Sequence, residues 1–160
     1  MKYTVIKDTR EKTGWDFDFY EKCEGVLKQG LKTGDYTAVG LEDHLRIERK
    51  ASTAEIALNL GRKREQFDAE MERIQEFRWK YIVCEFSEDT VMSFPQGSTI
   101  PKARWRHLRM NGKFMRKRLY NFETKYGVEI IFTNGKEEAE EKAIELIEAA
   151  YKTLKEENGK

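Results

Sequence analysis

The sequence predicts a single mixed α/β domain, and three observations lead to this prediction. Its 160 residues suit one domain that is large enough to bury a core. Charged residues make up 37% of the chain and hydrophobic residues 39%, a balance typical of a folded globular protein rather than a disordered one. Short β-rich runs come first along the chain and strand–helix pairs come later, which is the order expected for a mixed sheet with helices.

The first third of the chain is predicted to be mainly β-structure. Residues 3–7 read as a short strand, and a loop follows them. Residues 24–40 suggest one or two strands broken by glycines. Residues 41–45 have the composition of a turn, and residues 45–50 read as the next strand.

Helical spacing of apolar residues begins in the middle of the chain. Residues 64–80 predict an amphipathic helix, with Phe67, Met71 and Ile74 on its apolar face. Residues 81–86 form a continuous apolar run of the kind found in buried strands. Residues 91–101 are predicted to be a loop, because Pro95 and Gly97 break regular structure there.

The last third alternates helix, strand and helix. The basic segment that follows Pro101 reads as a helix that is interrupted or bent near Asn111-Gly112, and residues 127–133 read as another buried strand. The final helix has Ala139, Ala143, Ile147 and Ala150 along one face. We expect one domain over residues 1–155, with a flexible tail at 156–160.

Composition also excludes several classes of protein. No apolar run approaches the roughly 20 residues of a membrane helix, and the first residues lack the apolar segment of a secretion signal. Cys23 and Cys84 are far apart in the sequence, which favours two free thiols in a reducing cytoplasm over a disulfide. With His44 and His107 as its only histidines, the chain is a poor candidate for a histidine-rich zinc site.

Carboxylates on the predicted strands are the first candidates for chemistry. If residues 34–39 pair with residues 45–50 as a hairpin, Asp35 lies opposite or nearly opposite Glu48, with Cβ atoms about 5 Å apart. Two carboxylates that close repel each other, and a divalent cation offsets this repulsion. Lys50 lies on the same strand face as Glu48 because side chains alternate. A solvated hairpin with paired surface charges is the alternative.

A second acidic element before this hairpin widens the pattern. The residues "DTRE" follow the first predicted strand, and "GDY" and "IERK" follow in order. This combination over residues 3–150 resembles the XPF-type nuclease domain of the PD-(D/E)XK restriction-endonuclease-like superfamily. The resemblance implies a restriction-endonuclease-like core, in which helices flank a mixed central β-sheet. The matching positions are Asp8, Arg10, Glu11, Gly34, Asp35, Glu48, Arg49 and Lys50.

The resemblance implies an enzyme that hydrolyses DNA. Its fold relatives are Mg²⁺- or Mn²⁺-dependent endonucleases, often selective for branched, flap or junction DNA, that leave a 5′-phosphate and a 3′-hydroxyl. It implies that Asp35 and Glu48 bind the metal beside the catalytic Lys50. Asp8 and Glu11 would complete the acidic cluster. Two arginines, Arg10 and Arg49, either hold the carboxylates in place or contact a phosphate.

One position departs from the family pattern. The family often has an aspartate four residues beyond the lysine, where this chain has Ala54 followed by Glu55. Either Glu55 substitutes for it or the role is lost, so a noncatalytic DNA-binding or scaffolding protein is the alternative function. The compact chain resembles single-domain versions from phages and mobile elements, which implies a bacterial or phage-infected host cytoplasm. Family members often form homodimers.

A cluster of positive charge is the candidate DNA-binding surface. Phosphate contacts supply most nonspecific affinity for DNA, and aromatic residues are interleaved with these charges. The alternative is a solvated helix face that balances the acidic final helix. Two further acids, Glu70 and Glu85, are weaker site candidates, and Trp15 and Phe17 are expected to be packing residues. The predicted DNA-binding residues are Arg104, Arg106, Arg109, Lys113, Arg116, Lys117 and Arg118.

Overall fold

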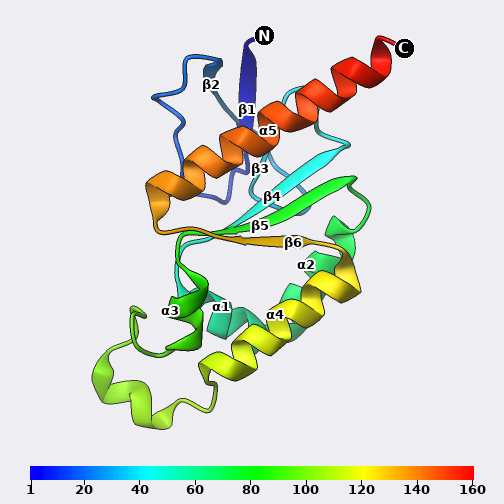
Figure 1. The fold of residues 1–160 in the computed structure, drawn as a ribbon. Coiled ribbons are helices and arrows are strands. Elements are labelled where there is room, and N and C mark those ends of the chain that lie inside the picture. Colours follow the sequence, from blue (N-terminus) through cyan, green and yellow to red (C-terminus); the bar gives the residue numbers. More distant parts are fainter.

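A six-stranded mixed β-sheet forms the centre of the molecule (Figure 1). The structure, a computed structural model, describes residues 1–160. The strands lie in the order β2-β1-β3-β4-β5-β6. Strand β3 is antiparallel to both β1 and β4, while the pairs β1–β2, β4–β5 and β5–β6 are parallel. The bounds are β1 Tyr3–Lys7, β2 Cys23–Lys28, β3 Tyr36–Ala38, β4 Leu45–Lys50, β5 Trp79–Cys84 and β6 Glu129–Phe132.

Helices cover both faces of this sheet, which confirms the predicted α/β class. Figure 1 shows α5 on one side of the sheet and α1, α2, α3 and α4 on the other. Each side has its own buried apolar cluster, so the domain has three layers. The bounds are α1 Thr53–Leu60, α2 Arg64–Ile74, α3 Glu88–Met92, the 3₁₀ helix η1 Lys102–His107, α4 Gly112–Tyr126 and α5 Lys136–Asn158.

The apolar faces predicted for two helices are the faces that pack on the sheet. Ala139, Ala143 and Ile147 of α5 are fully buried against the cluster that includes Val5 and Tyr36. Small residues allow α5 to lie close to the strands. On the other side of the sheet, Phe67, Met71 and Ile74 of α2 are also fully or almost fully buried.

Two segments differ from the predicted secondary structure. Helix α2 ends at Ile74 instead of reaching residue 80, because the residues from Trp79 onward pair with β4; the Trp79 N–H donates to the His44 carbonyl at 2.8 Å. The predicted loop after the next strand begins as helix α3. Ser87 caps that helix by accepting a hydrogen bond from the Thr90 N–H.

The basic segment is not one bent helix. It consists of η1, an irregular link over residues 108–111, and α4. The break lies at the predicted Asn111-Gly112, since Asn111 Oδ1 caps α4 by accepting from the Phe114 N–H at 2.9 Å. Gly112 is required for a second reason: a Cβ there would lie 2.1 Å from the Met92 carbonyl oxygen.

Three further features concern the ends and the cysteines. Helix α5 continues to Asn158, into the predicted tail, and Glu157 forms an ion pair with Arg78 at 2.7 Å. Cys23 and Cys84 are both free thiols. No helix in the structure combines the length and apolar character that a membrane span requires.

Candidate active site

The hairpin of β3 and β4 brings the two central carboxylates together, as the spacing predicts. Tyr36 pairs with Ile47, and the Asp35 N–H donates to the Ile47 carbonyl at 2.9 Å. This register places Asp35 beside Glu48 at the end of the antiparallel pair. The Asp35 side chain is held there by the Arg49 N–H, which donates to its Oδ2 at 2.7 Å.

Lys50 lies beside Glu48 on the same face of β4. Its Nζ donates to Glu48 Oε1 at 3.2 Å, lies 3.6 Å from Glu55 and sits over the Phe67 ring at 4.9 Å. The lysine is almost fully buried. Burial alone would lower its pKa, but the carboxylates of Glu48, Glu55 and Asp35 outweigh burial and raise the pKa. Lys50 is therefore a permanent positive charge at neutral pH.

The positive charge near Asp35 and Glu48 does not offset the cost of burying both carboxylates in ionised form. Burial, followed by repulsion from Glu48, raises the pKa of Asp35 well above its usual value. Burial also raises the pKa of Glu48, despite Lys50, and Glu70 adds to the effect. Asp35 Oδ1 and Glu48 Oε2 accept no hydrogen bond from the protein. Two carboxylate oxygens with free lone pairs, on residues that line a cavity, are the donor set that a hard divalent cation uses.

Both carboxylates line a polar cavity of about 410 Å³. Glu70 of α2 lines the same cavity, so the helix face that carries it looks into the site and not into open solvent. No three acidic, histidine or cysteine side chains converge on one metal-binding point. The other lining residues are Asp8, Arg10, Glu11, Thr13, Lys32, Thr33, Gly34, Arg49, Ala51, Glu55 and Arg73.

Asp8 and Arg10 form the edge of this cavity next to β1. Asp8 is buried, and both of its oxygens are engaged: Oδ1 accepts from the Leu31 N–H and Oδ2 from Arg10 Nε, each at 2.8 Å. Asp8 thereby fixes the segment that leads into Asp35. Arg10 Nη2 also donates to the Leu31 carbonyl at 2.6 Å, and the side chain is 70% exposed, so Nη1 is the part of the guanidinium that is left for a ligand.

Arg49 lies on the opposite face of β4 and makes a buried network. Its guanidinium forms a two-point ion pair with Glu85 at 2.8 and 3.0 Å and reaches Glu11 at 3.4 Å. The indole N–H of Trp15 also donates to Glu85, at 2.8 Å. Trp15 and Phe17 are buried and pack against Tyr36, which confirms their predicted packing role. Glu85 is thus the partner that positions Arg49.

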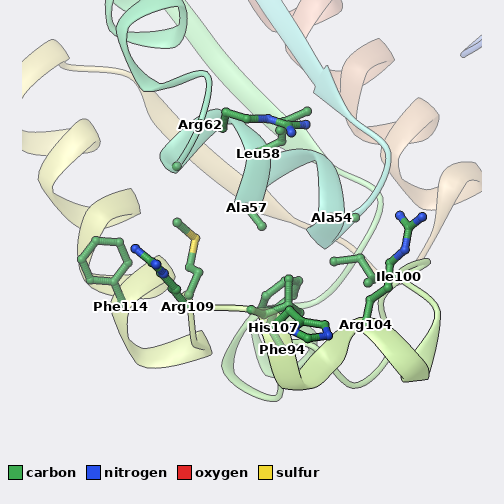
Figure 2. A pocket seen from close by; sticks show the side chains of 13 residues that line it. Ala54, Ala57, Leu58, Arg62, Phe94, Ile100, Arg104, His107, Arg109 and Phe114 are labelled. Atoms are coloured by element: carbon green, nitrogen blue, oxygen red, sulfur yellow. The ribbon is translucent and has the colours of Figure 1, made fainter.

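Helix α1 contains Ala54, the position four residues beyond Lys50 where the family often has an aspartate, and the neighbouring Glu55. Glu55 Oε2 accepts from the Ala51 N–H at 3.0 Å, and the Glu55 N–H donates to Ser52 Oγ at 3.2 Å. The two bonds form a variant of the capping box, in which Glu55 accepts from the residue before the N-cap Ser52 instead of from Ser52 itself. Ala54 lies on another side of α1, where it lines a separate apolar groove (Figure 2). Ala54 therefore does not face the acidic cavity.

The seven predicted DNA-binding residues divide among three elements. Arg104 and Arg106 lie in η1 and Arg109 lies in the link, while the other four belong to α4. Arg116 forms an ion pair with Glu88 at 2.7 Å, and Arg118 is stacked over Phe114 at 5.4 Å. These residues distribute positive charge over the outer surface of η1, the link and α4, on the side of the sheet that α1 to α4 cover (Figure 1).

Comparison with known proteins addresses the fold. No known family model and no curated protein matches the sequence. Among solved structures, XPF from Aeropyrum pernix matches with a TM-score of 0.64 and 17% identity, over 92% of this chain and 61% of that one. The same protein in complex with DNA matches with a TM-score of 0.63 and 16% identity, over 95% and 66%. This chain therefore spans about three fifths of the first of these structures, and it has the fold of an XPF nuclease.

Proposed function

We propose that this chain is a Mg²⁺- or Mn²⁺-dependent DNA endonuclease of the XPF type. The observation that carries the proposal is the pair Asp35 and Glu48, which line a polar cavity, with the buried Lys50 ammonium hydrogen-bonded to Glu48 beside it. The likeness to XPF structures, one of them in complex with DNA, supports the proposal, and so does the order of the three sequence motifs.

The chemistry of the carboxylates fits a divalent cation. Asp35 and Glu48 are the residues that would hold it, because each offers one oxygen with no protein hydrogen bond. One or two carboxylates with several waters are a usual set of ligands for Mg²⁺. Such an ion supplies an acidified water and polarises a phosphoryl oxygen. Asp8 and Glu11 remain predicted as additional ligands or as acceptors for ligand waters.

The remaining residues of the cavity have distinct tasks. Lys50 lies behind the cavity wall, where its ammonium is hydrogen-bonded to Glu48, and its positive charge would stabilise negative charge that develops on the phosphate. The exposed guanidinium of Arg10 and the side chains of Lys32 and Arg73 offer phosphate contacts at the rim. Arg49 is enclosed by Glu85 and Glu11 and acts as a positioning residue.

Branched, flap or junction DNA is the substrate class that we propose within this function. The motif resemblance supports it. Recognition would depend on the phosphate backbone and the shape of the DNA, because positive charge is spread over η1, the link and α4.

A noncatalytic DNA-binding or scaffolding protein is the second candidate function. Two observations favour it. Ala54, which stands where the family often has an aspartate, lines the apolar groove and not the acidic cavity. The neighbouring Glu55 is engaged in helix capping. Tight binding of DNA in EDTA, with no cleavage in either metal, would support this candidate over the nuclease.

A cleavage panel tests the proposed function. Purified protein would be incubated with flap, fork, four-way junction, single-stranded and linear duplex DNA, in Mg²⁺, in Mn²⁺ and in EDTA. We expect metal-dependent products that carry 5′-phosphates, with faster cleavage of the branched forms. A protein that leaves every substrate intact in both metals would contradict the proposal.

A further inference from the structure

A second, apolar groove lies next to the candidate active site. Its volume is about 920 Å³, and it lies between helix α1 and the segment 94–114 (Figure 2). Most of its surface is apolar, in contrast to the acidic cavity. The apolar side chains that line it include Ala57, Leu58, Phe94, Ile100, Met110 and Phe114.

The charged residues of this groove all have the same sign. Arg62, Arg104 and Arg109 line it together with His107, and no acidic side chain does. Figure 2 shows these residues around the space in front of α1, from separate parts of the chain. The groove is thus complementary to a ligand that combines an apolar, flat part with negative charge.

Helix α1 is the wall that the groove shares with the acidic cavity. Glu55 lines the acidic side, whereas Ala54, Ala57 and Leu58 line the apolar side. Two sites on different sides of a helix are separated by no more than its diameter, about 10–12 Å with side chains. A DNA strand that places a phosphate beside Asp35 therefore has its neighbouring nucleotides within reach of the groove.

We propose that the groove holds an unpaired nucleobase of the DNA strand that is bound at the acidic cavity. The inference rests on the proposed function, because it takes DNA as the ligand. Unstacked bases bind to aromatic rings and to the planes of arginine guanidiniums. The groove offers exposed rings in His107 and Phe114, and Arg104 and Arg109 offer guanidiniums that can also contact the flanking phosphates.

The test compares a normal strand with one that lacks its bases. Binding of a short labelled oligothymidylate and of an abasic oligomer with the same number of phosphates would be measured by fluorescence anisotropy in EDTA. Because stacking of one base contributes to affinity, we expect the wild-type protein to bind the normal strand roughly 5- to 150-fold more tightly. Equal affinity for the two strands would overturn the inference.

Matched variants assign the difference to the groove. Ala57→Phe fills it and should remove the preference for the strand with bases, while Ala103→Phe makes the same change at an exposed site in η1 outside the groove and should keep the preference. Thermal unfolding of each variant shows whether it folds. If Ala57→Phe is unfolded, Arg104→Gln with Arg109→Gln provides the same test, with Lys102→Gln as the control.

The outcomes separate this inference from the proposed function. A base preference that depends on the groove, in a protein that cuts no DNA, supports the inference and contradicts the nuclease. Metal-dependent cleavage without any base preference contradicts the inference alone. If Ala57→Phe instead weakens only the binding of a labelled amphipathic helix of leucine and glutamate, the groove is a site for acidic peptides and the inference is wrong.

Discussion

Arg49 and Asp35 are joined across the hairpin by a hydrogen bond from main chain to side chain: the Arg49 N–H donates to Asp35 Oδ2 at 2.7 Å. The guanidinium of the same arginine points to the other face of the sheet, where Glu85 holds it at two points. The orientation of the candidate metal ligand is therefore connected through β4 to a buried ion pair behind it.

Glu85→Gln tests this connection. The change leaves the shape of the side chain almost unaltered but removes the negative charge opposite the buried Arg49. Because the change leaves the enclosed guanidinium with only its longer contact to Glu11, at 3.4 Å, we expect the free energy of unfolding in urea to fall by about 3 kcal/mol. Glu157→Gln, which breaks the exposed pair with Arg78, should leave it unchanged within error. Equal effects of the two changes would contradict the role of Glu85.

Asp35→Asn should stabilise the metal-free protein at neutral pH. The folded state raises the pKa of Asp35, so the folded protein binds more protons than the unfolded chain between the unfolded pKa, about 4, and the raised folded value. Stability conferred by the protonated form is present below that window and is lost as the pH rises through it. Asparagine does not ionise, so the stability of Asp35→Asn does not fall as the pH rises through this window.

Thermal unfolding in EDTA measures the difference between the two proteins. We expect Asp35→Asn to raise the Tm by roughly 2–4 °C at pH 7, the equivalent of about 1 kcal/mol for a chain of this size, with little gain below pH 4. Asp43→Asn, at an exposed turn residue, is the control. Mg²⁺ should raise the Tm of the wild type and not that of Asp35→Asn. A lower Tm for Asp35→Asn in EDTA would contradict the account.

Glu55→Gln distinguishes capping from metal binding. Glutamine can replace glutamate in a capping box, so the start of α1 should persist and cleavage should stay within about threefold of the wild-type rate. A metal ligand that loses its charge would lower the rate far more, by roughly 100-fold. Single-turnover cleavage gives the answer, and a large loss would show that Glu55 substitutes for the aspartate of the family pattern.

Gly112→Ala tests the contact between α3 and α4. A Cβ at this position would lie 2.1 Å from the Met92 carbonyl oxygen, so the two helices must move apart. We expect the free energy of unfolding to fall by at least about 2 kcal/mol in urea. The control is Gly30→Ala, where the nearest atom would be 3.9 Å away and the change should stay within about 0.5 kcal/mol. Similar values for both would mean that α3 and α4 are not closely packed.

The hairpin site was predictable because it depends on short-range rules. The alternation of side chains along a strand places Lys50 beside Glu48, and one turn fixes the register that brings Asp35 next to them. Helix α2 was predicted to be too long. Its helical spacing of apolar residues continues beyond Ile74, but from Trp79 onward the chain pairs with β4 as strand β5. The capping box of Ser52 and Glu55 was a readable signal for α1 that the strand-based interpretation missed.

Other parts of the site depend on contacts between distant segments. The pair of Arg49 and Glu85 needs the parallel register of β4 and β5, which neither strand specifies alone. The position of Glu70 depends on how α2 is rotated above the sheet, and helical periodicity identifies an apolar face without saying what the polar face meets. The apolar groove forms only when residues of α1 and of the segment 94–114 come together.

Single-turnover cleavage of a branched DNA by wild type, Asp35→Asn and Lys50→Gln tests the central claim most directly. We predict Mg²⁺-dependent cleavage by the wild type, with the rate reduced by roughly 100- to 1000-fold in each variant because charge stabilisation in the site is lost. Asp43→Asn and Lys12→Gln, both at exposed positions outside the cavity, should cut at the wild-type rate. Cleavage by Asp35→Asn or Lys50→Gln at that same rate would contradict the assignment of the site.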